Sequence, residues 1–424
     1  MKNFVIKGDI CYSANKSTIN TIENGYAVCE NGISKGVFDK LPDQFSDYEV
    51  FDYSGKLILP AMVDLHTHAP QFAFCGLNMD AELIEWLSDS AFKEEAKYSD
   101  SSYADKAYSI FADALKNSVT TRACVFATLH KDATKLLMEK LENTGLCSFV
   151  GKVNMDRNAP HNLCEESAQK SADDTIKWII ETANKFENTK PILTPRFIPS
   201  CSDELMKKLA EIQKSSNLPV QSHLSENNSE IKWVQQLCPD SKNYGDAYDK
   251  FELFGKGAKT VMAHCVYSND DETKLMKQNG VFIAHCPASN TNLSSGIAPI
   301  RHYIDNDLKV GLGSDMAGGH CISLFRAIAD TVQVSKLYYR LIDENVTPVT
   351  FNEAFYLATI GGGEFFGKVG SFEKGYEFDA VVIDDSVLPH PQELSVHERL
   401  QRAVYLSADF KGLVTKFVKG KKII

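Results

Sequence analysis

The chain has 424 residues, of which 43% are hydrophobic and 24% charged, and its formal net charge at pH 7 is -11. This composition is typical of a globular protein with one large domain and additions, or with two to three smaller domains. The acidic balance argues against an electrostatic nucleic-acid surface, and the absence of a run of about 18 apolar residues excludes a transmembrane helix. Eleven cysteines without a C-x-x-C pair, and an amino terminus without the apolar stretch of a signal peptide, indicate reduced thiols in a cytoplasmic protein.

Both ends of the chain consist of short runs of β character separated by turns. Residues 4–6, 26–29, 36–38 and 49–51 predict small antiparallel strands, and residues 379–383 and 412–418 predict two more. Neither terminal segment can enclose a hydrophobic core alone, and chain termini often lie close together. We therefore expect one small β-sandwich domain built from both segments, residues 1–61 and 370–424.

The middle of the chain, residues 62–369, alternates apolar runs with segments of helical spacing, such as residues 102–117, 166–186, 203–215 and 270–279. Eight apolar runs separated in this way predict an α/β fold, a (β/α)8 TIM-type barrel. A doubly wound open sheet gives the same alternation and is the alternative at this point. The eight runs are residues 57–64, 119–127, 148–154, 192–197, 220–223, 260–264, 281–285 and 310–313.

Polar and ionisable residues stand at the end of almost every apolar run. The carboxyl ends of barrel strands form a single mouth, so these residues would converge there although they lie far apart in sequence. Such convergence favours the barrel over the open sheet. The residues concerned are His66, His68, Arg196, His223, Glu226, His264, His285 and Asp315.

The histidines of this set predict a metal site. His66 and His68 are two residues apart on an extended strand, so both side chains point to the same side. Taken singly, His223 could be a core histidine and Asp315 a helix cap, but together the four residues make three imidazoles and one carboxylate. This donor set suits one Zn²⁺ ion per chain, with Fe²⁺ as the alternative, and leaves a position open for water.

Glu226 follows His223 by three residues and can reach a substrate without binding the metal. A carboxyl in that place can move protons between nucleophile and leaving group, although an acid at the start of the next helix is the alternative. His264 is either a further ligand or the group that orients the attacking water, and we expect the second role. His285 is expected to support the site rather than to bind the metal.

These motifs resemble the amidohydrolase superfamily, and in detail its guanine deaminase branch. The resemblance covers essentially the whole chain, with the motifs in the same order. The segments that carry it are HTHAPQFAF at residues 66–74 with EWL at 85–87, TPRF at 194–197, QSHLSEN at 221–227, VMAH at 261–264 and GLGSDMAGG at 311–319.

The resemblance implies zinc-dependent hydrolysis of guanine at C2, which yields xanthine and ammonia. It implies that Asp315 takes the proton of the water, that Glu226 protonates ring nitrogen N3, and that His264 steers the hydroxide. Gln71, Arg196 and Phe197, together with Glu226, would hold the purine base, with Arg196 toward its O6 edge. A homodimer is implied as well, with no nucleic-acid or membrane partner.

Other functions stay open from the residues themselves. Another aminohydrolase of the same barrel could act on a different aminopurine, a pterin, a triazine or an adenosine-derived thioether, against which Gln71 and the Pro195-Arg196-Phe197 sequence argue. An inactive scaffold would have lost metal ligands or the acid, and all of them are present. A binuclear hydantoinase-like enzyme needs a bridging lysine at the end of the fourth run, where Arg196 stands instead. We further hypothesise that residues 78–100, with Trp86, cover the pocket.

Overall fold

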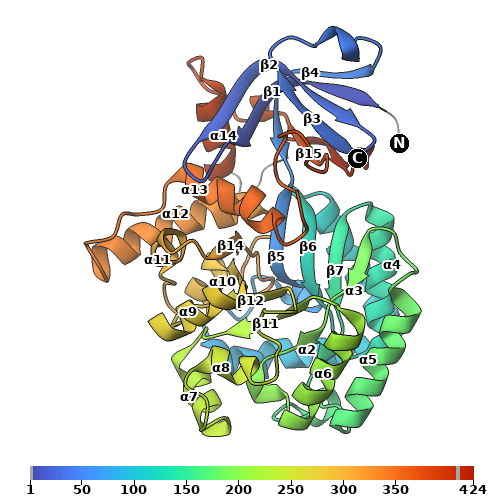
Figure 1. Cartoon of the computed structure of the whole chain (residues 1–424), viewed down its shortest axis with the longest axis vertical. Helices are drawn as coiled ribbons and strands as arrows, with labels where there is room; N and C mark the ends of the chain where they lie inside the picture. Colours follow the sequence, from blue (N-terminus) through green and yellow to red (C-terminus); the bar gives the residue numbers. More distant parts are fainter. Residues whose placement is uncertain (1–2, 407–410) are drawn as a thin grey trace.

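The computed structural model describes residues 3–406 and 411–424. Residues 1–2 and 407–410, which the predicted terminal domain includes, lie outside the described residues. Figure 1 shows a larger helix-covered barrel and, at one end of it, a smaller sheet in which strands from the two ends of the chain lie side by side.

Eight parallel strands form the sheet of the larger part, within the residues described above, in the order β11-β12-β13-β14-β5-β6-β7-β9. A parallel bridge between Leu193, next to β9, and Val220 of β11 joins the two ends of this sheet. The predicted barrel is therefore confirmed over the open sheet. Its strands are β5 (Met62–His68), β6 (Thr120–Phe126), β7 (Cys147–Gly151), β9 (Thr189–Pro191), β11 (Val220–Leu224), β12 (Thr260–His264), β13 (Phe282–His285) and β14 (Lys309–Leu312).

Seven of the eight predicted apolar runs overlap one of these strands, and three runs differ in detail. The fourth run, residues 192–197, was predicted wrongly as a barrel strand: β9 ends at Pro191, before this run begins. Residues 57–60 of the first run belong to β4 (Glu49–Pro60) in the terminal sheet, so the barrel begins only at β5. The later part of the third run, β8 (Val153–Asn154), pairs with β10 (Thr194–Pro195) of the fourth run in a separate two-stranded sheet. Proline explains why the barrel strand ends before the fourth run, because neither Pro191 nor Pro195 has an N–H to continue the ladder.

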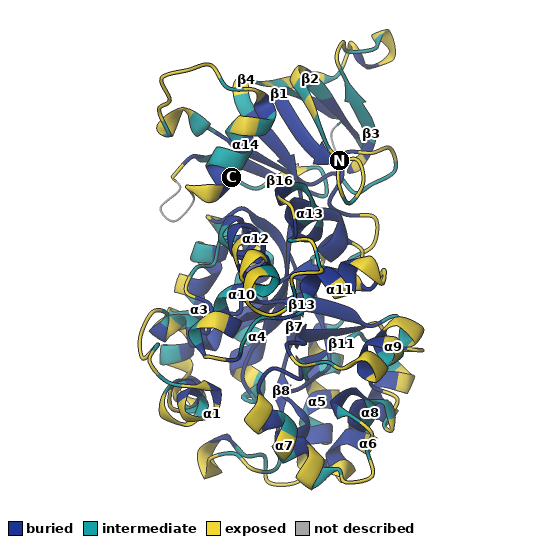
Figure 2. Ribbon diagram, turned by 90° about the vertical axis from the view of Figure 1, so that its left-hand side faces the viewer, coloured by how far each residue is buried: buried dark blue, intermediate teal, exposed yellow. Residues whose placement is uncertain are grey.

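Helices cover the outside of the barrel, with their exposed residues turned away from the buried strands (Figure 2). In α3, for example, Ala104, Tyr108, Phe111 and Leu115 recur at helical spacing and are all buried. None of the described helices is both long and apolar enough to span a membrane. The helices are α1 (Leu83–Trp86), α2 (Phe92–Glu95), α3 (Ser101–Lys116), α4 (Lys131–Thr144), α5 (Ala168–Thr182), α6 (Asp203–Ser216), α7 (Asn228–Leu237), α8 (Tyr244–Asp249), α9 (Asp270–Asn279), α10 (Pro287–Asn292), α11 (Ile300–Asp305), α12 (Leu324–Leu341), α13 (Phe351–Tyr356) and α14 (Val396–Tyr405).

The two terminal segments combine, as predicted, in one mixed sheet, which has seven strands among the described residues. One pairing was predicted wrongly: β4 runs parallel to β1, because the connection after β3 returns across the sheet to the other side of β1. In sheet order the strands are β17 (Lys421–Lys422), β16 (Leu413–Val418), β15 (Ala380–Ile383), β4, β1 (Phe4–Ser13), β2 (Ile19–Glu30) and β3 (Ile33–Phe38).

Helix α14 lies between β15 and β16 in sequence, where the pattern predicted only β structure. Its signals were present: Ser395 and Glu398 form a capping box, and Val396, Leu400 and Val404 recur at intervals of four residues. The missed helix packs against β1, β2 and β4 and so covers one side of the terminal sheet.

A buried lysine joins the terminal sheet to the barrel. The side chain of Lys416, on β16, is fully buried, and its Nζ donates to the carbonyl oxygens of Thr120 at 2.8 Å and Leu115 at 3.4 Å. No carboxylate pairs with it among residues 3–406 and 411–424. Burial, with a smaller contribution from Lys116, lowers the pKa of Lys416 to about 7.

This lysine predicts a pH dependence of stability. The ordinary lysine pKa of 10.5 holds in the unfolded chain, which therefore binds more protons than the folded chain between about pH 7 and that value. The free energy of unfolding should then rise with pH in this window, by up to about 1.4 kcal/mol per pH unit. Lys416→Met should remove this rise in denaturant titrations, whereas Lys422→Met, on the exposed strand β17, should keep it. If the free energy of unfolding varied with pH in the same way in both variants, Lys416 would not be the source of the rise.

Candidate active site

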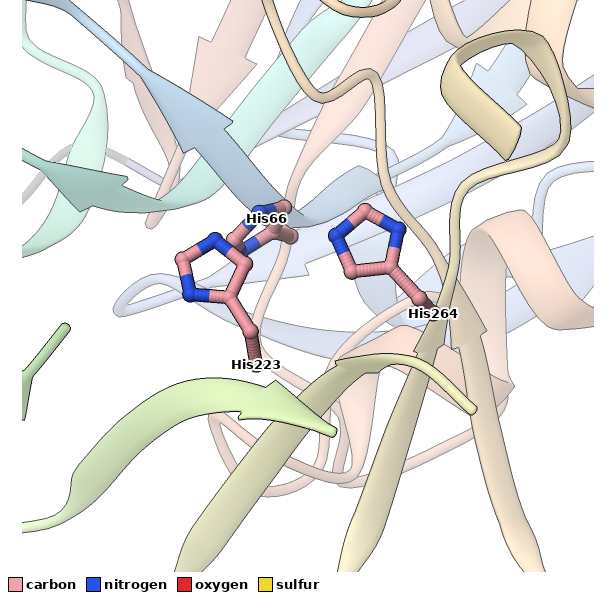
Figure 3. Close-up of side chains that lie close together, drawn as sticks. All are labelled: His66, His223 and His264. Atoms are coloured by element: carbon pink, nitrogen blue, oxygen red, sulfur yellow. The ribbon is translucent and has the colours of Figure 1, made fainter. Parts of the chain in front are cut away.

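The four predicted metal ligands converge at the mouth of the barrel. The Nε2 atom of His68 lies 3.2 Å from the Nε2 atoms of both His66 and His223. The Oδ1 atom of Asp315 lies 3.1 Å from His66 Nε2 and 3.5 Å from His68 Nε2. Figure 3 shows the imidazoles of His66 and His223 turned toward a common space, with His264 beside them.

The donor set and its spacing fit a tetrahedral metal ion. Ligand bonds of about 2.0–2.1 Å in a tetrahedron separate neighbouring donor atoms by about 3.3–3.4 Å, which is close to the separations between these nitrogen and oxygen atoms. Burial is the main cause that holds the pKa values of His68 and His223 well below the ordinary histidine value. Both imidazoles are therefore neutral at neutral pH and offer lone pairs to a cation.

Neighbouring groups fix the orientation of the ligands. The Nδ1–H of His223 donates to the carbonyl oxygen of Arg196 at 2.6 Å, which leaves Nε2 as the free lone pair. Asp64, which we had not singled out, accepts from the backbone N–H groups of His66 and Ser314 and from the Ser314 hydroxyl. Its carboxylate thus ties the first barrel strand to the end of the last one, next to Asp315.

Two residues at the mouth of the barrel have an unfavourable backbone conformation of the kind that occurs at functional sites. His264 and Asp315 have φ values of 74° and 46°, in the left-handed region, where a residue other than glycine costs on the order of 1–3 kcal/mol. Gly313 allows β5 and β14 to approach closely, since a Cβ there would lie 3.0 Å from the Cβ of His66. Close packing of the two strands therefore brings Asp315 to the histidines.

Glu226 lies beside the metal ligands and does not join them. Its Oε2 is 3.4 Å from Nε2 of His264, and its Oε1 accepts from the hydroxyl of Ser295 at 3.1 Å. Burial, and then the charge of Asp315, raises the pKa of Glu226 to about 8. The carboxyl therefore carries a proton at neutral pH and can act as an acid.

The two remaining histidines of the mouth differ in their surroundings. His264 Nδ1 lies 2.9 Å from Oδ1 of Asn290, and its Nε2 lies 3.7 Å from Oδ2 of Asp315. A ring held in this way can orient a water molecule between the two carboxyl groups. Both ring nitrogens of His285 are buried without a hydrogen-bond partner, and burial lowers its pKa to about 3. His285 is thus a neutral ring packed behind the site.

A cavity lies directly over these groups, and apolar side chains and a few polar ones line it, as in small-molecule sites. One wall comes from the segment that we expected to cover the pocket: Leu83 and Trp86 of α1 and the following Leu87 line the cavity. The other lining residues are His68, Gln71, Arg196, Phe197, His223, Glu226, Glu230, His264, Leu293 and Asp315.

The three residues expected to hold a ligand border this cavity. Gln71 and Arg196 are each only 2% exposed, and Phe197 stacks edge-on against Trp233. Sequence reasoning missed Glu95, a fully buried carboxylate that accepts from Gln71 Nε2 at 2.9 Å and from Arg196 Nη1 at 2.6 Å. No local pattern marks Glu95, because both of its partners lie on other elements of the fold.

The barrel with a buried His/Asp metal-binding group at its mouth, an adjacent acid and a cavity above them defines the class: a hydrolase of the amidohydrolase type. The model of the amidohydrolase family matches residues 57–422. Guanine deaminase from Dictyostelium discoideum is 38% identical over 383 residues, which cover 88% of this chain and 84% of that protein. The Escherichia coli enzyme of the same name is 34% identical over 420 residues, 96% of this chain and 92% of its own.

Solved structures agree with these matches. A guanine deaminase from C. acetobutylicum with guanine bound in its active site is 43% identical, with a TM-score of 0.96 and complete coverage of both chains. A triazine hydrolase from Arthrobacter with a TM-score of 0.85 is 16% identical and therefore shares only the fold. The chain belongs to the amidohydrolase family, and within it to the guanine deaminases.

Proposed function

We propose that the protein hydrolyses guanine to xanthine and ammonia. The observation that carries the proposal is the convergence of His66, His68, His223 and Asp315 beneath one cavity, with the protonated Glu226 at its edge. A relative that matches the whole chain binds guanine in its active site. Membership of the guanine deaminases adds further support.

The base is held by three side chains in this proposal. Arg196 donates to the C6 carbonyl, Gln71 contacts the polar edge of the ring system, and Phe197 packs against the purine. Support comes from their place in the lining of the cavity and from their burial. A planar uncharged base suits such a site, because a few fixed polar groups set its orientation between apolar walls such as Leu83 and Trp86.

Zn²⁺ is the proposed ion, one per chain, held by His66, His68, His223 and Asp315. When bound, it supplies a Lewis acid that lowers the pKa of water from 15.7 toward about 7. Water adds to C2 while Glu226 gives its proton to N3. Asp315 accepts the proton of the water at Oδ2, and His264 orients that water. The amino group then takes up the proton held by Asp315 and leaves as ammonia when the C2–N bond breaks, while the hydroxyl group on C2 gives its proton to Glu226 and becomes a carbonyl.

Three further properties belong to the same proposal. The chain divides into a terminal domain of residues 1–61 and 370–424 and a catalytic domain of residues 62–369, in keeping with the separate terminal sheet and barrel. The enzyme is cytoplasmic, which accords with its eleven cysteines, since none of them forms a disulfide in the part of the chain that the structure describes. It acts as a homodimer, as inferred from the resemblance.

The decisive experiment is ammonia release from guanine, adenine, cytosine and a pterin, before and after chelation and after Zn²⁺ is added back. Guanine alone should be deaminated, chelation should abolish ammonia release, and Zn²⁺ should restore it. Metal analysis of the purified protein should give one ion per chain. Bound metal without guanine turnover would overturn the assignment of guanine as the substrate. Absence of both metal and activity would favour the alternative that the protein is an inactive scaffold.

A further inference from the structure

Glu95 is a buried charge without a part in the proposed reaction. It lies at the end of α2, in the segment that forms one wall of the cavity, and its side chain is fully buried. Its Oε1 accepts from Gln71 and its Oε2 from Arg196, while Glu95 itself does not line the cavity. The carboxylate therefore stands behind the two side chains that face the ligand.

These contacts fix both recognition groups before a ligand arrives. The amide of Gln71 has a defined direction, because its Nε2 donates to Glu95 and its Oε1 accepts from the N–H of Ala317 at 3.3 Å. The guanidinium of Arg196 is held by Glu95 on one atom and lies 4.9 Å from the ring centre of Phe92, also on α2. Preorganised donors of this kind lose little entropy on binding.

Glu95 also balances the charge of the pocket. Arg196 is almost completely buried, and a buried guanidinium without a counter-charge is strongly unfavourable unless an anion joins it. The ion pair with Glu95 supplies that counter-charge from within the protein. Arg196 can therefore donate hydrogen bonds to a ligand, but because Glu95 neutralises its charge, it attracts an anionic ligand only weakly.

We propose that Glu95 is a positioning and specificity residue: it aligns Arg196 and Gln71, and by neutralising Arg196 it makes the pocket favour an uncharged base over an anionic one. This inference rests on the proposed deamination of guanine. Guanine is uncharged at neutral pH, whereas the product, with a second carbonyl in place of the amino group, is a stronger acid and forms an anion near neutral pH. Glu95 thus limits retention of the product.

The test compares two ligands with the same C6 carbonyl, at a pH where xanthine is mostly an anion and hypoxanthine is uncharged. Binding of each to the zinc-loaded protein is measured by calorimetry, and competitive inhibition of guanine turnover is measured in parallel. Glu95→Gln keeps the shape of the side chain and removes its charge. We expect this variant to shift the ratio of affinities toward xanthine by about tenfold.

Two further variants separate charge from position. Glu95→Asp keeps the charge but cannot reach both partners, so it should weaken both ligands, raise KM for guanine more than it lowers kcat, and leave the xanthine to hypoxanthine ratio within about twofold. Glu94→Gln makes the same change as Glu95→Gln one residue earlier, where the carboxylate contacts Lys97 and Tyr103 away from the cavity. This control should leave both affinities unchanged.

The outcomes separate a failure of this inference from a failure of the proposed guanine deamination. An unchanged ratio in Glu95→Gln, with guanine still turned over, would overturn the inference alone. If Glu95→Gln does not fold, Glu95→Asp decides. A tenfold change in its xanthine to hypoxanthine affinity ratio would overturn the inference, because the position of the carboxylate rather than its charge would then set the preference. A parent protein that neither deaminates guanine nor binds hypoxanthine would overturn the proposed function and this inference together.

Discussion

Glu226→Gln is expected to lower kcat for guanine by about 10²–10⁴-fold, the usual contribution of a positioned acid or base. Glutamine has the same shape but no acidic proton, so the hydroxyl of Ser295 keeps a partner while N3 loses its proton donor. The raised pKa of Glu226, about 8, means that this proton is present in the parent enzyme at neutral pH. Ammonia release under saturating guanine measures the effect.

Metal analysis gives this prediction its control. Glu226 is not among the four ligands, so Glu226→Gln should retain the same amount of metal as the parent protein. His223→Ala, which removes a ligand, should lose both metal and turnover. If Glu226→Gln keeps more than about a tenth of the parent kcat, Glu226 is not the main proton donor.

The second large effect is expected in substrate discrimination. If Arg196 donates to the C6 carbonyl, the parent enzyme should prefer guanine over 2-aminopurine, which lacks that carbonyl, by about 10⁴–10⁵-fold in kcat/KM. With 2-aminopurine bound, the buried guanidinium would be left with an unsatisfied donor. Arg196→Met should remove most of this preference, mainly by lowering kcat/KM for guanine.

Stability measurements show whether Arg196→Met acts locally. The substitution leaves the buried carboxylate of Glu95 without its cation, and breaking such a pair costs about 3–5 kcal/mol. Arg196→Met combined with Glu95→Gln removes both charges and should recover much of the free energy of unfolding, yet it should not recover the preference for guanine. Recovery of both properties would show that Arg196 serves the fold rather than the ligand.

The barrel and the metal-binding group could be predicted because both depend on local patterns. Apolar runs identified seven of the eight strands, all except β9, and the rule that barrel strands end at one mouth brought His66, His223 and Asp315 together. The H-x-H spacing on a strand then specified the shared direction of two ligands. At the mouth, the pocket is lined by six of the residues expected there, and His66 lies beside them, whereas His285 lies behind the site; their roles stay predictions. The six are His68, Arg196, His223, Glu226, His264 and Asp315.

What escaped prediction depends on contacts between distant segments. Glu95 receives its role from Gln71 and Arg196, which lie on other elements, and helix propensity says nothing of such partners. The parallel pairing of β1 with β4 depends on the path of the chain across the sheet, since a short strand has the same pattern in either direction. The role of Asp64 could not be predicted either, because its partner Ser314 lies far away in sequence, just after the last barrel strand.

The pairing of β4 with β15 has a consequence for synthesis on the ribosome. β4 leads into the first barrel strand, yet its antiparallel neighbour, with Ala380 opposite Pro60, is translated only after almost the whole barrel. Until then a nascent chain exposes an open strand edge, which is a template for intermolecular pairing. Slow translation or early release of the chain before β15 should therefore favour aggregation, and chaperones that shield β structure would act on this protein during that interval.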